Sequence, residues 1–404
     1  QEFDLVIEYI CDSDMNESLK QRLLGEAYFL RAYYYFRLVR AYGGVPLSLS
    51  IENDDSQWDR ARSSKEVIYA QIISDLENAE SRLWNKSETS GADMGRATKG
   101  AAQAMLMKVY MYMHEYAKAK EWGDKFLQDQ AAEYSLAPDF ASNFTIAGEN
   151  NEESIFEIQY ANEATSDYGS GNGSTRGTFT QVLTRSRSTN MGDEGWGFNK
   201  PTHNLYNEYE EADSLRRDAT IILLDSAHLG EQDTYLGTSY LNRKTGLYNA
   251  DGTGYTYKNA HNTRGVLNNK QYRLADFYLL YAEACLGIGD ASTATIYLNK
   301  VRTRVGLPTY PGYTFKVNGE EITSPTLEEA IRHERRMELA MEGHRWFDLC
   351  RWGVAYEVMT AYMALESSEA KAEMQPFKKG VHELLPIPNK QRQLNPSLTQ
   401  NPGY

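Results

Sequence analysis

Residues 272–305 read YRLADFYLLYAEACLGIGDASTATIYLNKVRTRV, and this stretch carries the pattern that decides the fold. Apolar and small residues recur every three or four positions on both sides of Gly289-Asp290, which is the spacing of two amphipathic helices. The sequence therefore predicts a helical hairpin over 272–288 and 291–305. Small residues such as Ala284 and Ala294 would let its two helices approach closely.

The same pattern occurs a second time, 175 positions earlier, where Val109 and Ala119 take the places of Ala284 and Ala294. Further helices are predicted over 16–42, 65–84, 97–113, 116–127, 327–341 and 346–365. Recurring helical hairpins with Ala and Gly at their contacts are typical of tetratricopeptide-type repeats. The predicted fold class is therefore mainly α, a tetratricopeptide-like helical-pair scaffold with a long irregular insertion that contains short strands.

The insertion is rich in Gly, Asn, Ser, Thr and Tyr and lies between the two helical parts of the chain. We expect a short strand over 154–160 and a hairpin turn over 248–254. The predicted organisation is an N-terminal helical part (1–149), an irregular aromatic-rich insertion that would form the ligand-binding face (150–270), and a C-terminal helical part that completes the same domain (271–404). Long insertions of this kind usually carry function.

Composition excludes several classes of function. The 404 residues include 42 Lys and Arg against 56 Asp and Glu, so the formal net charge of −14 opposes binding to nucleic acid or to anionic lipid. No stretch approaches the ~20 apolar residues of a membrane span. The three cysteines lie far apart without a CxxC, which argues against a disulfide framework or a zinc site, and we expect them to be small buried apolar residues.

A search for catalytic motifs finds no GxSxG, Walker A loop or HExxH in the sequence. The acidic pairs Asp193-Glu194 and Glu210-Glu211 could serve a glycoside hydrolase, but adjacency in sequence does not establish the separation of ~5 to 9.5 Å that such carboxylates need. Solvated surface charge is the simpler interpretation. We therefore predict no catalytic residues, no metal ligands and no cofactor.

The aromatic content points to a different chemistry, because 29 tyrosines accompany 13 Phe and 6 Trp. An exposed ring can cover the C–H face of a sugar while neighbouring polar groups bind its hydroxyls. The predicted carbohydrate-binding residues are Tyr168, Trp196, Phe198, Tyr255 and Tyr257. Tyr255 and Tyr257 would share one face of a predicted strand. Trp196 directly precedes a predicted helix over 202–209, so a buried structural role remains open for it.

A second cluster mixes charges with large apolar groups over residues 334–352. Buried charges must be paired, so we expect an ion network that serves the fold. Arg31, Arg336, Arg345 and Asp348 are predicted to be largely buried and ion-paired.

Three blocks of this sequence resemble the SusD/RagB family. Residues 24–36 read LGEAYFLRAYYYF, followed by YGGVPL at 42–47. Residues 334–339 read ERRMEL and 342–349 read EGHRWFDL, which is similar to a signature near the family's C-terminus. The third block is LPIP at 385–388, with NP at 395–396 and QNPGY at 400–404. The blocks occur in family order across nearly the whole chain.

This resemblance implies a non-catalytic, surface-exposed outer-membrane lipoprotein of Bacteroidota. It would capture oligosaccharide or polysaccharide and deliver it to a SusC-like TonB-dependent transporter, its expected partner. A peptide-binding, RagB-like member is the alternative, and a glycoside hydrolase or a helical-repeat adaptor is less favoured. Family members begin with a lipidated Cys, so we expect the anchor segment and signal peptide to be missing here. Cys11 lacks the small residue expected before such an anchor.

Overall fold

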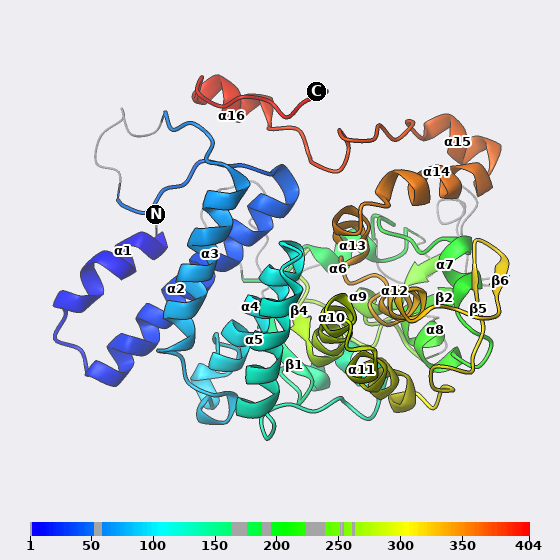
Figure 1. Ribbon diagram of the computed structural model, residues 1–404, viewed down its shortest axis with the longest axis horizontal. Coiled ribbons are helices and arrows are strands. Elements are labelled where there is room, and N and C mark those ends of the chain that lie inside the picture. The colour runs from blue at the N-terminus through cyan, green and yellow to red at the C-terminus, as the bar shows by residue number, and fades with distance from the viewer. Residues whose placement is uncertain are drawn as a thin grey trace. The chain divides into compact units, whose positions relative to one another are not determined.

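A computed structural model describes residues 2–51, 59–162, 176–187, 195–223, 239–250, 252, 254–260 and 263–404. Within these ranges helices dominate and the strands are short, as Figure 1 shows. No helix in the described ranges combines the length and the apolar character that crossing a bilayer requires. The predicted fold class, mainly α with a few short strands, is confirmed.

The α-helices are α1 (Glu2–Tyr9), α2 (Glu17–Tyr42), α3 (Lys65–Glu80), α4 (Lys99–Tyr112), α5 (Tyr116–Asp129), α6 (Thr180–Thr184), α7 (His203–Glu208), α8 (Ser214–Thr220), α9 (Arg243–Gly246), α10 (Leu274–Gly287), α11 (Ala291–Arg304), α12 (Leu327–Glu338), α13 (Arg345–Arg351), α14 (Ala355–Leu365), α15 (Ser368–Glu373) and α16 (Asn389–Leu394). The strands are β1 (Ser154–Ile158), β2 (Ile221–Leu223), β3 (Tyr240–Asn242), β4 (Asn269–Arg273), β5 (Phe315–Val317) and β6 (Glu320–Ile322).

The two predicted helical hairpins are confirmed as α4–α5 and α10–α11. All four helices have 14 residues, and α10 and α11 begin 175 residues after α4 and α5, respectively. The small residues at the predicted contacts are fully buried, including Ala119, Ala284 and Ala294. Since an Ala side chain adds little bulk, the paired helices pack at close range.

The turns of the two hairpins also correspond residue by residue. His114 and Gly289 occupy the same place and both have a left-handed backbone, with φ of 59° and 86°. Glu115 and Asp290 follow as the N-cap residues of α5 and α11, with nearly the same φ and ψ. Only the shorter Asp290 side chain caps its helix, by accepting a hydrogen bond from the backbone N–H of Thr293 at 3.1 Å.

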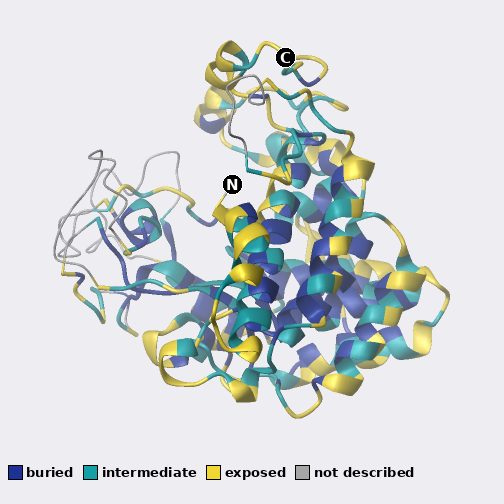
Figure 2. Ribbon diagram, turned by 90° about the vertical axis from the view of Figure 1, so that its left-hand side faces the viewer, coloured by how far each residue is buried: buried dark blue, intermediate teal, exposed yellow. Residues whose placement is uncertain are grey.

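The chain forms two compact units. The first comprises residues 1–133, 349–356 and 376–404, and its core lies where α3 packs against α2 and α4. The second comprises residues 134–348 and 357–375, and α10 packs there against α11 and α12. The central helices α4 and α10 are buried on nearly all sides, and Figure 2 shows buried residues concentrated in the interior and exposed residues at the surface. The residues of the predicted insertion belong to the second unit, together with α10 to α12.

The strands form three two-stranded antiparallel sheets among the described residues. β1 pairs with β4, β2 with β3 and β5 with β6. The predicted strand over 154–160 is confirmed as β1, whose register with β4 is irregular. The predicted hairpin turn is also present, because Tyr248 and Tyr255 form an isolated bridge and the Asn249 N–H donates to the carbonyl of Gly254.

Three expectations were wrong in detail. Tyr272 and Arg273 end strand β4 instead of beginning a helix, because they pair with Phe156 and Ser154 of β1. The helix predicted over 346–365 is broken between α13 and α14, where Gly353 has a φ of 70° that does not fit a helix. Cys11 is exposed, in a short 3-10 turn, whereas Cys285 is buried as expected.

Candidate functional site

The short helix α6 supports an exposed aromatic segment in the second unit. Residues 195–198 run back along it, and the backbone N–H groups of Trp196 and Phe198 donate to the carbonyls of Val182 and Leu183 at 2.8 and 2.7 Å. The N–H groups of Gly195 and Gly197 donate to Ser186 and Arg185. Four backbone hydrogen bonds therefore fix a segment that has no regular secondary structure.

The two glycines around Trp196 allow this close approach. A Cβ atom on Gly195 would lie 2.3 Å from the carbonyl oxygen of Arg185. Since that oxygen belongs to the backbone, it could not move aside for a side chain. Gly197 has a φ of 66°, and a Cβ there would lie 2.7 Å from the Arg187 side chain. The Gly-Trp-Gly pattern is thus explained by contact with the end of α6.

The side chains on this segment face solvent. Trp196 is 40% exposed and Phe198 is 57% exposed. Their rings meet nearly edge to face, with centroids 6.1 Å apart, and Trp196 meets Phe179 in the same manner at 5.1 Å. We call Phe179, Trp196 and Phe198 the aromatic platform. Since its backbone is fixed, the platform presents large apolar rings with little conformational entropy left to lose on binding.

A polar cavity of about 240 Å³ adjoins the platform along the chain. Phe179 lies between two of its lining residues, Thr178 and Thr180, and Phe198 precedes another, Asn199. Uncharged amides and hydroxyls make up much of the wall. The lining residues are Asn143, Phe144, Thr178, Thr180, Gln181, Asn199, Lys244, Thr245, Leu267, Asn268, Asn269, Lys270, Met341, Glu342 and Gly343. We call this space the amide cavity.

The charged groups of the amide cavity are paired with each other or with neighbours. Lys244 Nζ donates to Glu342 Oε1 at 2.7 Å and to the Glu338 carbonyl at 3.0 Å. Burial lowers the pKa of Lys244 to about 8, against the opposing attraction of Glu342. Burial alone would raise the pKa of Glu342, but the charges of Arg273 and Lys244 outweigh it and lower that pKa to about 2. Lys270 pairs with Glu157.

The predicted residue Tyr255 is packed into the fold more than the platform is. Its ring lies 5.0 Å from that of Tyr248, on a small core that includes Ile222 and Leu241. The Arg185 guanidinium lies 4.0 Å from the centre of the Tyr255 ring. The expected strand is absent here, since the described residues around Tyr255 form only the isolated bridge to Tyr248. Tyr255 and Tyr257 therefore do not form a strand-borne platform.

Tyr257 lies partly buried against the cluster of Leu247, Val266 and Leu267. It also lines a second cavity of about 330 Å³, which shares Phe144 with the amide cavity. Tyr168, the remaining predicted contact, lies outside the described residues. Of the five predicted residues, the structure brings Trp196 and Phe198 together and packs Tyr255 and Tyr257 against two separate buried clusters.

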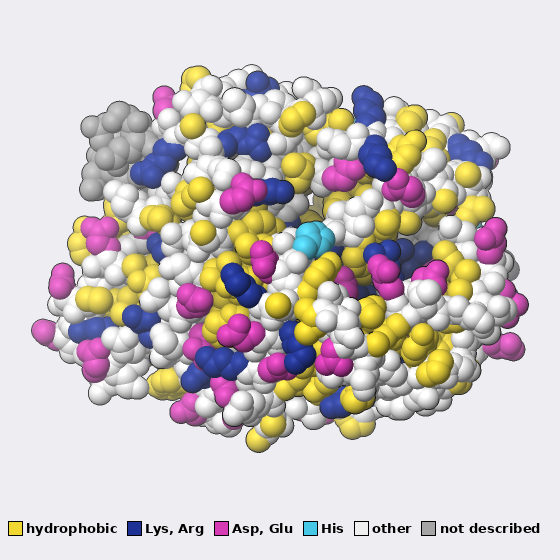
Figure 3. Space-filling model, in the orientation of Figure 1, with side chains coloured by type: hydrophobic (Ala, Val, Ile, Leu, Met, Phe, Trp, Pro, Cys, Tyr) yellow, Lys and Arg dark blue, Asp and Glu magenta, His cyan; other side chains and the backbone are white. Residues whose placement is uncertain are grey.

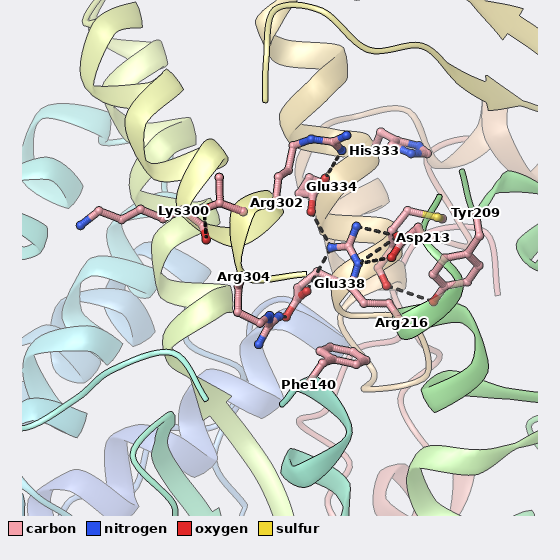
Figure 4. A network of polar contacts seen from close by, with 12 residues as sticks. Phe140, Tyr209, Asp213, Arg216, Lys300, Arg302, Arg304, His333, Glu334 and Glu338 are labelled. Atoms are coloured by element: carbon pink, nitrogen blue, oxygen red, sulfur yellow. Dashed lines mark hydrogen bonds and ion pairs between the residues drawn. The ribbon is translucent and has the colours of Figure 1, made fainter. Parts of the chain in front are cut away.

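The charge-dense stretch forms the ion network expected from its sequence. Arg216 is fully buried and contacts Asp213, Glu334 and Glu338, as Figure 4 shows. Glu334 also binds Arg302, and Glu338 also binds Arg273 and Arg304. The network joins α8, α11, α12 and β4. Its acidic and basic side chains form ion pairs with one another, as expected of a network that stabilises the fold.

The four charges predicted to serve the fold behave differently from one another. Arg31 is 7% exposed and pairs with Asp4 and Asp75, and the buried Asp348 pairs with Arg335. Arg336 is half-buried and pairs with Glu208. Arg345 is half-buried, and burial lowers its pKa to about 10. The prediction is confirmed for Arg31 and Asp348 and holds only in part for the other two.

Of the acidic pairs considered for hydrolysis, Glu210-Glu211 lies within the described residues, and its Glu210 is held in an ion pair. Glu210 binds the Arg302 guanidinium with both oxygens, at 2.8 and 3.0 Å. Burial would raise the pKa of Glu210, yet the nearby His333 and the hydrogen bonds and charge of Arg302 lower it to about 2. Asp193 and Glu194 lie outside the described residues. Within the described ranges, no three His, Cys, Asp or Glu residues gather as metal ligands would.

Sequence reasoning missed Phe179 and Gln181. Phe179 packs against Trp196 in the aromatic platform, and Gln181 lines the amide cavity. The flanking Thr178-Phe179-Thr180 and Phe198-Asn199 combine a ring with polar neighbours, which was the available signal.

Over the face in Figure 3, acidic and basic side chains are interspersed without a large field of one sign.

Comparison with known proteins gives two family matches. The model described as "SusD family" matches residues 224–404, and the one described as "Starch-binding associating with outer membrane" matches residues 2–111. A SusD-like protein of Bacteroides ovatus is 29% identical over 374 residues, and the match covers 86% of this chain and 62% of that protein. The chain thus spans less than two thirds of that relative.

Other relatives are covered more fully. A SusD-like protein of Formosa agariphila is 30% identical over 372 residues, covering 83% of this chain and 67% of that protein. A solved "Laminarin binding SusD-like protein" has 31% identity and a TM-score of 0.79, over 100% of this chain and 83% of that one. Surface glycan-binding protein A from Bacteroides thetaiotaomicron, solved in complex with laminarihexaose, has 25% identity and a TM-score of 0.77, over 99% and 83%. On sequence and fold together, the chain belongs to the SusD/RagB family.

Proposed function

We propose that this protein binds a neutral glycan without cleaving it and passes it to a SusC-like TonB-dependent transporter at the outer membrane. The observation that carries the binding role is the aromatic platform, in which Trp196 and Phe198 are exposed on a fixed backbone. Its residues adjoin, along the chain, those that line a cavity of amides and hydroxyls. Rings cover the C–H faces of sugars, and amides bind hydroxyls. The solved relatives named for laminarin and laminarihexaose binding support the same ligand class.

The non-catalytic role rests on how the acids of the second unit are used. Glu210, Glu334, Glu338 and Glu342 are each bound to Arg or Lys and serve the fold. The family matches indicate no enzyme. Delivery to the transporter and attachment through a lipid anchor follow from family membership and belong to the proposal.

Tyr168, Tyr255 and Tyr257 remain predicted contacts with the glycan. Tyr257 is the stronger of the two described ones, because it lines the 330 Å³ cavity, which shares Phe144 with the amide cavity. Tyr255 is the weaker one, because its ring packs against Tyr248 and the Arg185 guanidinium.

Affinity electrophoresis in gels that contain laminarin, or another polysaccharide chosen on a glycan array, tests the binding role. The native chain should be retarded, and Trp196→Ala with Phe198→Ala should remove most of that retardation. Leu215→Ala is the matched control, because Leu215 is also a large exposed apolar residue in the second unit, at 64%. Retardation by no polysaccharide, or release of reducing sugar by the native chain, would contradict the proposal. Binding of peptides in place of glycans would favour the RagB-like alternative.

A further inference from the structure

One buried polar group in the amide cavity has no partner among the described residues. Gln181 is 1% exposed, and its Oε1 accepts a hydrogen bond from the backbone N–H of Val266 at 2.8 Å. Its Nε2 is buried without a hydrogen bond to any described group. An unsatisfied buried amide of this kind costs about 1–3 kcal/mol, so a native fold that keeps one needs a reason.

The orientation of that amide is fixed by its surroundings. Because Oε1 faces the Val266 N–H, the two N–H groups of Nε2 must point elsewhere. Gly265 makes this arrangement possible, since a Cβ at that position would lie 1.8 Å from Gln181 Oε1. Gly265 is itself held by two backbone hydrogen bonds with Thr178, at 2.8 and 2.7 Å. Gln181, which lines the cavity, is therefore held in place with an unused hydrogen-bond donor.

Several other polar groups of the wall already have partners. Asn143 donates to Glu153, and Asn268 donates to Glu157 and Gln159. Lys244 is paired with Glu342, and Lys270 with Glu157. Since the lining cations already have carboxylate partners, the cavity offers little attraction to an anion. A neutral ligand with acceptor oxygens matches it best.

We propose that the amide cavity holds one neutral sugar ring of the glycan, with a ring hydroxyl accepting a hydrogen bond from Gln181 Nε2. This inference rests on the proposed glycan-binding function and deepens it by adding a polar subsite to the exposed platform. The volume of about 240 Å³ is smaller than the ~300–1,000 Å³ of sites for drug-sized ligands, which suits a single ring. Phe144, partly buried in the wall, supplies an apolar surface for the C–H groups of that ring.

Helix α6 contributes to both the amide cavity and the aromatic platform, and this predicts how a glycan chain would bind. Thr180 and Gln181 of α6 line the cavity, while Val182 and Leu183 carry the backbone of the platform. A chain that stacks on Trp196 and Phe198 would place a terminal or branching ring in the cavity. Affinity should therefore rise when an oligosaccharide gains the ring that reaches it.

Calorimetric titration with laminari-oligosaccharides of increasing length, or with fragments of whichever polysaccharide retards the native chain, tests the subsite. Gln181→Glu keeps an acceptor for the Val266 N–H but removes the donor, and should weaken binding about tenfold, the effect of losing one well-placed hydrogen bond. The loss should be confined to oligosaccharides long enough to show the rise in affinity. Gln393→Glu, an exposed change of the same kind, is the control for added charge.

A second variant keeps the test decisive if Gln181→Glu does not fold. Thr245→Tyr fills the cavity from a half-buried position and should also abolish the added affinity of the longer chains. If both variants bind all lengths as the native chain does while Trp196→Ala weakens them, the cavity holds only water and this inference is overturned, but the proposed function stands. If the native chain binds no glycan, both proposals fall.

Discussion

The substitution Arg216→Met tests whether the ion network stabilises the fold. Arg216 is fully buried, and its guanidinium contacts the Asp213 carboxylate three times, at 2.9, 2.9 and 2.6 Å. After the change, Glu334 keeps Arg302 and Glu338 keeps Arg273 and Arg304. The main cost is therefore one buried carboxylate without its cation, about 3–5 kcal/mol, and not three times that amount.

Urea unfolding followed by tryptophan fluorescence would measure this loss. Arg217→Met is the matched control, because the neighbouring Arg217 pairs with Asp218 at the surface and should contribute at most about 1 kcal/mol. Adding Asp213→Asn to Arg216→Met should restore part of the lost stability, since it removes the uncompensated charge. A loss below about 1 kcal/mol for Arg216→Met, or strictly additive effects in the double variant, would refute the structural role of the network.

Three further predictions concern stability. Arg31→Met should destabilise the first unit by about 3 kcal/mol, because it removes the guanidinium that pairs with the buried carboxylates of Asp4 and Asp75, and the urea midpoint would show it. Glu115→Asp should stabilise that unit by roughly 0.5–1 kcal/mol by supplying the cap that Asp290 gives α11, and an unchanged melting temperature would contradict this. The folded pKa of Glu342 is about 2 against an ordinary 4.5, so the unfolded chain binds more protons between these values. The stability that Glu342 contributes above pH ~4.5, roughly 3 kcal/mol, is therefore lost as the pH falls towards 2. In Glu342→Gln the free energy of unfolding should fall less steeply over this pH range.

The helical part of the fold was predictable because it depends on local spacing. Small residues such as Ala119 and Ala294 mark the contacts between paired helices in both hairpins. The 175-residue offset between the hairpins extends even to the turn residues His114 and Gly289. Helix ends were less accurate, since they depend on caps and strand pairing. The pairing of Tyr272 with Phe156 joins residues more than a hundred positions apart, which periodicity does not reveal.

The candidate site was only partly predictable for the same reason. Sequence indicated which segments are rich in aromatics, but whether a ring is exposed depends on contacts between distant segments. Trp196 is exposed because its backbone is bound to α6, and Tyr255 is packed because Arg185 lies over its ring. Gln181 gave no signal in the sequence, since its importance comes from a hydrogen bond to Val266 and from the absence of a side chain at Gly265.

A crystal structure of the protein with a bound oligosaccharide, laminarihexaose being the first to try, tests the central claim most directly. We predict a sugar ring in van der Waals contact with Trp196 or Phe198, with its C–H face on the aromatic ring and its hydroxyls facing Asn199 and the amide cavity. An oligosaccharide bound elsewhere on the chain, with the aromatic platform bare, would contradict the account.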